Sequence, residues 1–167
     1  MSVTPTGRIE RTADGNAVLV LTRDFAAAAD DVWAAITESD RLARWIGTFS
    51  GDPATGCVLF QMNAEGEATP EAMEIDECDP PRLLAVTSHS GSNTWRLRLR
   101  LTDIEGGTRL TFTQPGIDPV EAENIGPGWE YYLDRLAAAE SGADVAAIDF
   151  DRDYYPAMLE YYRGQPA

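Results

Sequence analysis

The stretch that decides the fold is residues 94–114, which read TWRLRLRLTDIEGGTRLTFTQ. Large apolar side chains alternate with arginine from residue 95 to residue 101. Because successive side chains of a strand point to opposite faces, the apolar groups share one face and the arginines the other. Residues 103–107 form a turn, and residues 108–113 repeat the alternation on the return. We therefore predict an antiparallel hairpin with one buried face and one exposed face.

Further strands are expected on the N-terminal side of this hairpin. Turn residues separate segments with a period of two, and with the hairpin the predicted strands are residues 57–63, 71–77, 83–88, 94–102 and 108–114. Residues 18–25 are rich enough in strand-forming residues to add another. Residues 1–16 are polar, and we expect a leader or a first edge strand there. The sheet should therefore have about six antiparallel strands.

Two short helices are expected between the first strand and the others. Residues 26–37 and residues 38–45 carry apolar positions at helical spacing. Residues 47–56 contain two glycines and a proline beyond Gly47, and we interpret them as a loop.

A long C-terminal helix is expected after Pro119. Apolar and aromatic residues recur there every three or four positions, and Gly142 is a plausible stop. The sequence Gly-Pro-Gly at residues 126–128 leaves open whether the helix begins there or continues through a kink. Residues 143–164 have the spacing of one short amphipathic helix that ends at Gly164.

These elements predict an α+β fold in which a curved antiparallel sheet wraps around the long C-terminal helix. We expect one domain over residues 1–167, because about 100 to 200 residues is the usual domain size. Its core should comprise residues 17–142. Residues 143–167 should form a helical extension that packs on the body.

The chain is strongly acidic, with 28 acidic residues and 13 basic residues that are all arginine. Its net charge of −15 repels phosphate backbones, so nucleic acid is not an expected partner. The sequence has neither a signal-peptide pattern nor the roughly 20 consecutive apolar residues of a membrane span, so we expect a cytoplasmic protein without membrane insertion. We interpret the arginines of residues 96–100 as an exposed row paired with acids such as Glu74 and Asp76; an anion-binding patch is the alternative.

Few residues could carry a metal or a nucleophile. Cys57 and Cys78 fall on separate predicted strands, and we expect small core residues rather than a disulfide. His89 is the only histidine and has no Cys or His at ligand spacing. We therefore predict no metal site, no cofactor and no nucleophilic catalytic residue.

The expected functional site is a cavity between the sheet and the terminal helix. Inward-facing aromatic and apolar residues predict its walls, and these are Trp45, Phe49, Phe60, Met62, Met73, Trp95, Leu97, Phe112, Trp129, Tyr132 and Leu133. The alternative is that these side chains fill the interior at ordinary packing density. Glu121, Glu123 and Glu130 are the acids best placed to overlook the mouth of such a cavity.

An ordered set of motifs resembles a known family. The motifs are Val32-Trp33-x-x-Ile36-Thr37, Leu42-x-x-Trp45, Gly47, Asp79-Pro80-Pro81-x-Leu83, Thr108-Arg109-Leu110-Thr111-Phe112, Gly116, and Gly128-Trp129 followed by Leu133 and Leu136. Over residues 18–136 they resemble the bacterial family homologous to the C-terminal domain of the heat-shock ATPase activator (AHSA-type). That family lies in the START, or SRPBCC, superfamily of birch-pollen-allergen-like proteins and polyketide cyclases. The resemblance implies a helix-grip fold and, as in many members, a cavity for a hydrophobic molecule. Members often have His where this chain has Gln114.

Three functions are compatible with these features. The leading hypothesis is binding or carriage of a small hydrophobic or amphipathic ligand, such as a lipid or polyketide, with Tyr132 or His89 as an orienting polar group. The second is a cyclase, dehydratase or hydrolase in which an acid or a tyrosine in the same cavity moves a proton. The third is a stress-response or chaperone-associated interaction protein that uses the tyrosine-rich extension for docking or homodimer contact.

Overall fold

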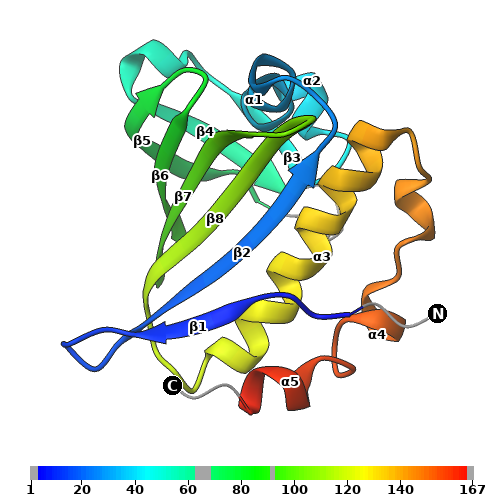
Figure 1. Ribbon diagram of the computed structural model, residues 1–167. Helices are drawn as coiled ribbons and strands as arrows, with labels where there is room; N and C mark the ends of the chain where they lie inside the picture. The colour runs from blue at the N-terminus through cyan, green and yellow to red at the C-terminus, as the bar shows by residue number, and fades with distance from the viewer. Residues whose placement is uncertain (1–3, 63–68, 91–92, 165–167) are drawn as a thin grey trace.

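An eight-stranded antiparallel sheet curves around one long helix in the computed structural model, which describes residues 4–62, 69–90 and 93–164 (Figure 1). The strands are β1 (Arg8–Arg11), β2 (Ala17–Phe25), β3 (Gly47–Ser50), β4 (Cys57–Met62), β5 (Glu71–Asp79), β6 (Leu83–Ser90), β7 (Asn93–Ile104) and β8 (Gly107–Ile117). Their order across the sheet is β1-β2-β8-β7-β6-β5-β4-β3. The pairing of β2 with β8 therefore brings the first and last long strands together.

The β7–β8 hairpin has the two-faced pattern that the sequence predicts. Leu99 of β7 lies opposite Phe112 of β8, and both side chains are buried. The arginines of β7 are exposed on the other face. There Arg98 lies 3.8 Å from Glu77 of β5, so the prediction of an exposed arginine row is confirmed, with Glu77 as an acid that pairs with it.

The sheet has more strands than the six or so expected from the sequence. β1 is the edge strand that was one of two interpretations of residues 1–16, and it pairs with β2. β3 lies in the segment expected to be a loop, and it pairs with β4. With only four residues, β3 is too short to show a period-two pattern. Its first residue is Gly47, where a Cβ atom would lie 2.3 Å from the carbonyl oxygen of Gln61.

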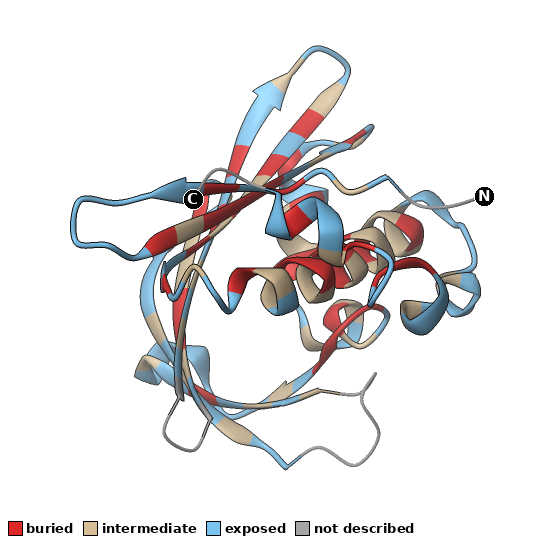
Figure 2. Ribbon diagram, turned by 90° about the horizontal axis from the view of Figure 1, so that it is seen from below, coloured by how far each residue is buried: buried red, intermediate tan, exposed pale blue. Residues whose placement is uncertain are grey.

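The helices follow the expected order. α1 (Ala29–Thr37) and α2 (Ser39–Leu42) come after β2, and the long helix α3 (Ala122–Ser141) comes after the sheet. α3 begins before the Gly-Pro-Gly segment, so Pro127 lies inside it. It ends at Gly142, whose φ of 79° is the left-handed conformation common at helix C-termini. The sheet curves around α3 (Figure 2), and the main core cluster joins side chains of β2, β8, α1 and α3.

The C-terminal extension forms three short helical segments instead of one amphipathic helix. They are the 3₁₀ turn η2 (Val145–Ala147), α4 (Phe150–Asp153) and α5 (Leu159–Arg163). Pro156 separates α4 from α5, because proline has no N–H group to continue a helix. Tyr154, which follows α4, is fully buried in the same cluster as the inner residues of α3. The extension therefore adds to the core.

A buried polar cluster attaches both ends of the described chain to α3. The Glu130 carboxylate accepts hydrogen bonds from the hydroxyl of Tyr162 (2.6 Å), from the N–H and hydroxyl of Thr6 (2.7 Å each) and from the N–H of Gly7 (3.1 Å). Arg23 of β2 lies 3.0 Å from the same carboxylate. Burial alone would raise the pKa of Glu130, but the hydrogen bonds outweigh burial and hold this pKa below its ordinary value. Glu130 is therefore a buried, ionised anchor.

Candidate functional site

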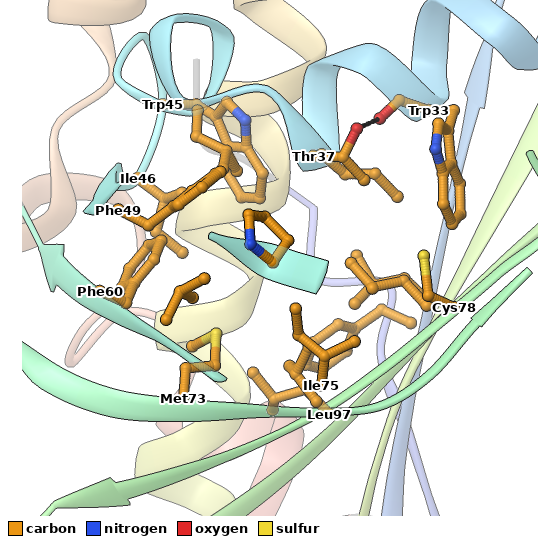
Figure 3. A pocket seen from close by; sticks show the side chains of 18 of the residues that line it. Trp33, Thr37, Trp45, Ile46, Phe49, Phe60, Met73, Ile75, Cys78 and Leu97 are labelled. Carbon is orange, nitrogen blue, oxygen red and sulfur yellow. Dashed lines mark hydrogen bonds between the residues drawn. The ribbon is translucent and has the colours of Figure 1, made fainter. Parts of the chain in front are cut away.

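One cavity lies between α1, α2, α3 and the inner face of the sheet (Figure 3). We call it the apolar cavity, and its volume is about 220 Å³. It is lined by Trp33, Ile36, Thr37, Leu42, Trp45, Ile46, Phe49, Pro53, Val58, Phe60, Met73, Ile75, Cys78, Leu84, Val86, Leu97, Leu99, Phe112, Trp129 and Leu133. Apart from the indoles, only Thr37 and Cys78 have polar side-chain atoms. The Thr37 hydroxyl donates to the carbonyl oxygen of Trp33 (2.7 Å), which leaves the cavity almost without polar groups for a guest.

The second cavity lies between the first half of α3 and the ends of β4, β5, β6 and β7. We call it the wide cavity, and its volume is about 830 Å³. It is lined by Ile46, Phe60, Met62, Thr69, Glu71, Met73, Ser88, Trp95, Leu97, Glu121, Asn124, Ile125, Gly128, Trp129, Tyr131, Tyr132 and Phe150. Its wall combines aromatic rings with hydroxyl, amide and carboxylate groups, and therefore differs in chemistry from the apolar cavity.

The two cavities adjoin. The side chains that line both are Ile46, Phe60, Met73, Leu97 and Trp129. Of these, Met73 has an unbranched, adaptable side chain that can change rotamer at little cost. These five side chains therefore form the boundary between the two cavities.

Hydrogen bonds orient two of the indoles in these walls. The indole N–H of Trp45 donates to the carbonyl oxygen of Ala35 (3.0 Å), and that of Trp129 donates to the side-chain oxygen of Gln114 (2.8 Å). Trp129 also packs on Phe112, with 4.4 Å between ring centroids. Because both N–H groups bond to the protein, these indoles offer their apolar rings to the cavities.

Every residue predicted from the sequence to line a cavity lines one of these two. Trp45, Phe49, Phe112 and Leu133 belong to the apolar cavity; Met62, Trp95 and Tyr132 to the wide cavity; and Phe60, Met73, Leu97 and Trp129 to both. For four of these residues the reason lies in their spacing along a strand. Phe60 and Met62 are two apart on β4, and Trp95 and Leu97 are two apart on β7, so each pair points inward.

The sequence reasoning missed other members of the walls. Trp33 of α1 and Phe150 of the extension reach the cavities only because of how those segments pack on the sheet. Glu71 could have been found, since it is two residues before the inward-facing Met73. Acidic side chains are mostly exposed, which hides this signal. Cys57 and Cys78 are both exposed, so the prediction that they are core residues is wrong. Neither forms a disulfide, and Cys78 lines the apolar cavity.

His89 cannot orient a guest in either cavity. Its neighbour Ser88 lines the wide cavity, so His89 points to the opposite face of the sheet. There the imidazole is half exposed, with Nε2 3.5 Å from the carboxylate of Glu74. The acid Asp76 accepts a hydrogen bond from Thr87. Glu74 and Asp76 are thus on the outer face as expected, but with partners other than arginine.

Only one of the three acids expected at the cavity mouth borders a cavity, and it is Glu121. Glu130 follows Trp129 directly, and consecutive residues of a helix are turned by about 100°, so it points away from the wall that Trp129 forms. Glu123 is 2.6 Å from Arg163 of α5. Glu130 and Glu123 therefore both attach the C-terminal extension to α3.

Among residues 4–62, 69–90 and 93–164, no group of three or more His, Cys, Asp or Glu side chains could hold a metal ion. The helices within these residues are also too short or too polar to cross a bilayer.

A curved antiparallel sheet, two short helices after β2 and a long C-terminal helix beside a cavity define a helix-grip protein of the START/SRPBCC class. The family described as "Activator of Hsp90 ATPase homolog 1-like protein" matches residues 26–140. The chain therefore belongs to this family, and the resemblance inferred from its motifs is confirmed.

Solved structures agree on the fold. CalU16 from Micromonospora echinospora is 23% identical, with a TM-score of 0.65, over 98% of this chain and 92% of CalU16. EF2215 from Enterococcus faecalis, described as a conserved protein of unknown function, is 18% identical, with a TM-score of 0.68, over 95% and 88% of the two chains. DynU16, a protein in the dynemicin biosynthetic locus, is 24% identical, with a TM-score of 0.66, over 77% of this chain and 49% of DynU16. No curated protein matches the sequence.

Proposed function

We propose that the protein binds a small hydrophobic or amphipathic molecule in the apolar and wide cavities. The observation that carries the proposal is the pair of adjoining cavities, of about 220 and 830 Å³, between the sheet and α3. Ligand sites are typically concave, largely apolar and roughly 300–1,000 Å³ in volume. The wide cavity falls in this range. The apolar cavity is large enough for one ring or a short branched chain, since about 150 Å³ accommodates benzene.

Burial of apolar surface supplies the driving force. Each Å² removed from water contributes about 25 cal/mol, so a guest that buries roughly 400 Å² gains about 10 kcal/mol. Loss of translational and rotational freedom costs at least about 4 kcal/mol. The remainder of about 6 kcal/mol corresponds to a Kd of tens of micromolar. Polar groups of the wide cavity, including Tyr132, orient the guest and add to the favourable free energy of binding.

The protein contains its own reporter of occupancy. Its four tryptophans all line the cavities: Trp33 and Trp45 the apolar one, Trp95 the wide one, and Trp129 both. A guest should therefore change the intrinsic fluorescence of the protein. Titration with lipids, sterols and aromatic polyketides, together with native mass spectrometry, measures affinity and stoichiometry.

Trp95 is the most informative position to vary. It lines the wide cavity from β7, is only partly buried and is not among the main core cluster or its packed neighbours, so Trp95→Ala should fold. The matched control is Arg96→Ala, which changes the next residue on the exposed face. We expect Trp95→Ala to weaken binding at least about fivefold, from lost aromatic contact of roughly 1 kcal/mol, and Arg96→Ala to leave it unchanged. The proposal fails if no compound alters the fluorescence or the native mass, or if both variants bind as the unmodified protein does.

A further inference from the structure

The charges around the cavities are unevenly distributed. The 13 basic residues of the chain are all arginine, and none lines either cavity among the described residues. Several are engaged elsewhere; Arg41, for example, pairs with Glu140, and Arg109 lies 2.7 Å from Asp24. Glu71 and Glu121, in contrast, line the wide cavity. The described wall of the wide cavity is therefore anionic without a cationic side chain.

The two carboxylates come from opposite walls. Glu71 is the first residue of β5, on the inward side with Met73, whereas Glu121 immediately precedes α3. Aromatic rings complete the same cavity, including Trp95 from the sheet and Trp129 from α3. The negative groups thus belong to the cavity that also carries the aromatic surface.

Carboxylates and aromatic faces both attract cations. A cation within about 6 Å of a ring centroid is stabilised by the negative face of the ring. Carboxylates add direct Coulomb attraction, which is stronger beside low-dielectric protein than in water. An anionic head group, in contrast, would have to leave water and face two like charges without a cationic partner.

We propose that the guest is an amphiphile with a cationic amine, which lies in the wide cavity between Glu71 and Glu121 while its apolar part points toward the apolar cavity. This inference rests on the proposed function and specifies its ligand class. It predicts that amphiphiles with a carboxylate, such as fatty acids, are rejected.

Three probes with one alkyl chain separate charge from hydrophobicity: decylamine, decanol and decanoate, each below its micellar concentration. Tryptophan fluorescence and isothermal titration calorimetry measure binding. We expect decylamine to bind about tenfold more tightly than decanol, equivalent to about 1.4 kcal/mol, and decanoate more weakly than decanol. The preference for decylamine should decrease at high ionic strength, because salt screens the exposed Glu121.

Substitutions of the two acids test which residues cause the preference for decylamine. Glu71→Gln and Glu121→Gln should each reduce decylamine affinity severalfold more than they reduce decanol affinity. Glu105→Gln is the control, because it changes the net charge equally in the exposed turn between β7 and β8 and lines neither cavity. If Glu105→Gln weakens decylamine binding as much, the preference comes from the overall charge and the inference is wrong. Equal affinities for all three probes, or tighter binding of decanoate, overturn the inference but leave the proposed function standing, whereas no binding of any probe counts against both.

Discussion

Replacing Glu130 with Gln should lower the free energy of unfolding by about 3 kcal/mol. One carboxylate oxygen accepts from the Tyr162 hydroxyl and from the N–H groups of Thr6 and Gly7; the other accepts from the Thr6 hydroxyl and from Arg23. An amide must place its NH₂ group at one of these two positions, where it faces donors in either orientation. The substitution also removes the negative charge beside Arg23, whose side chain is only 12% exposed.

The magnitude follows from these contacts. A lost hydrogen bond to a charged group costs about 1.5–3 kcal/mol, and a buried donor left without an acceptor costs about 1–3 kcal/mol. Arg23 keeps a second carboxylate, Asp134, at 2.9 Å. The expected loss is therefore at the lower end of the roughly 3–5 kcal/mol seen when one partner of a buried ion pair is removed.

Urea unfolding followed by circular dichroism measures this loss, and the melting temperature should fall by roughly 6–12 °C at about 2–4 °C per kcal/mol. Glu123→Gln is the matched control on the same helix. Its salt bridge with Arg163 involves a 59% exposed arginine, so it should cost less than about 1 kcal/mol. Losses for the two variants that agree within about 0.5 kcal/mol would refute the assignment of Glu130 as a buried anchor.

The stabilisation that Glu130 provides should also depend on pH. The pKa of Glu130 is lowered by folding, so the unfolded chain binds this proton more tightly than the folded protein does. The ionised group therefore contributes its full stabilisation above the ordinary Glu value of about 4.3, and this contribution is lost as pH falls through the lower folded-state pKa. The stability difference between the unmodified protein and Glu130→Gln should narrow between about pH 7 and pH 3. A difference that stays constant or widens would contradict this sign.

Other substitutions test the packing around the cavities. Trp129→Phe removes the indole donor of the buried Gln114 and should cost about 1–2 kcal/mol in urea unfolding; an unchanged midpoint would argue against that hydrogen bond. Gly107→Ala would place a Cβ atom 1.8 Å from the carbonyl oxygen of Phe25, so we expect a loss of about 2–3 kcal/mol by thermal melting, and a neutral result would contradict this close approach. Phe150→Ala removes the contribution of the extension to the wide cavity and should speed dissociation of a bound amphiphile severalfold in stopped-flow fluorescence. An unchanged rate would mean that the extension does not retain the guest.

The sequence by itself determined the elements whose pattern is local. The alternation of residues 95–101 is enough to assign both the strand and its buried face, because a period of two is a property of the backbone. The same rule predicted that Phe60, Met62, Trp95 and Leu97 point inward, and the three- and four-residue spacing on α3 did so for Trp129 and Leu133; all six line one of the cavities. The order of the helices and the main strands followed from these local patterns and agrees with the structure, and the family motifs indicated the family that the match confirmed.

Only the tertiary structure decided features that depend on how distant segments meet. β3 exists because residues 47–50 lie beside β4, and four residues carry too little pattern to predict this pairing. Glu130 was placed at a cavity mouth because it is an acid on α3, but the N-terminal segment and α5 cover it and use its charge. Glu71 and Glu121 are 50 positions apart in the sequence, and only the curvature of the sheet around α3 brings both to one cavity. Spacing along the chain decides which face a side chain occupies, whereas what it meets there depends on long-range packing that no local period encodes.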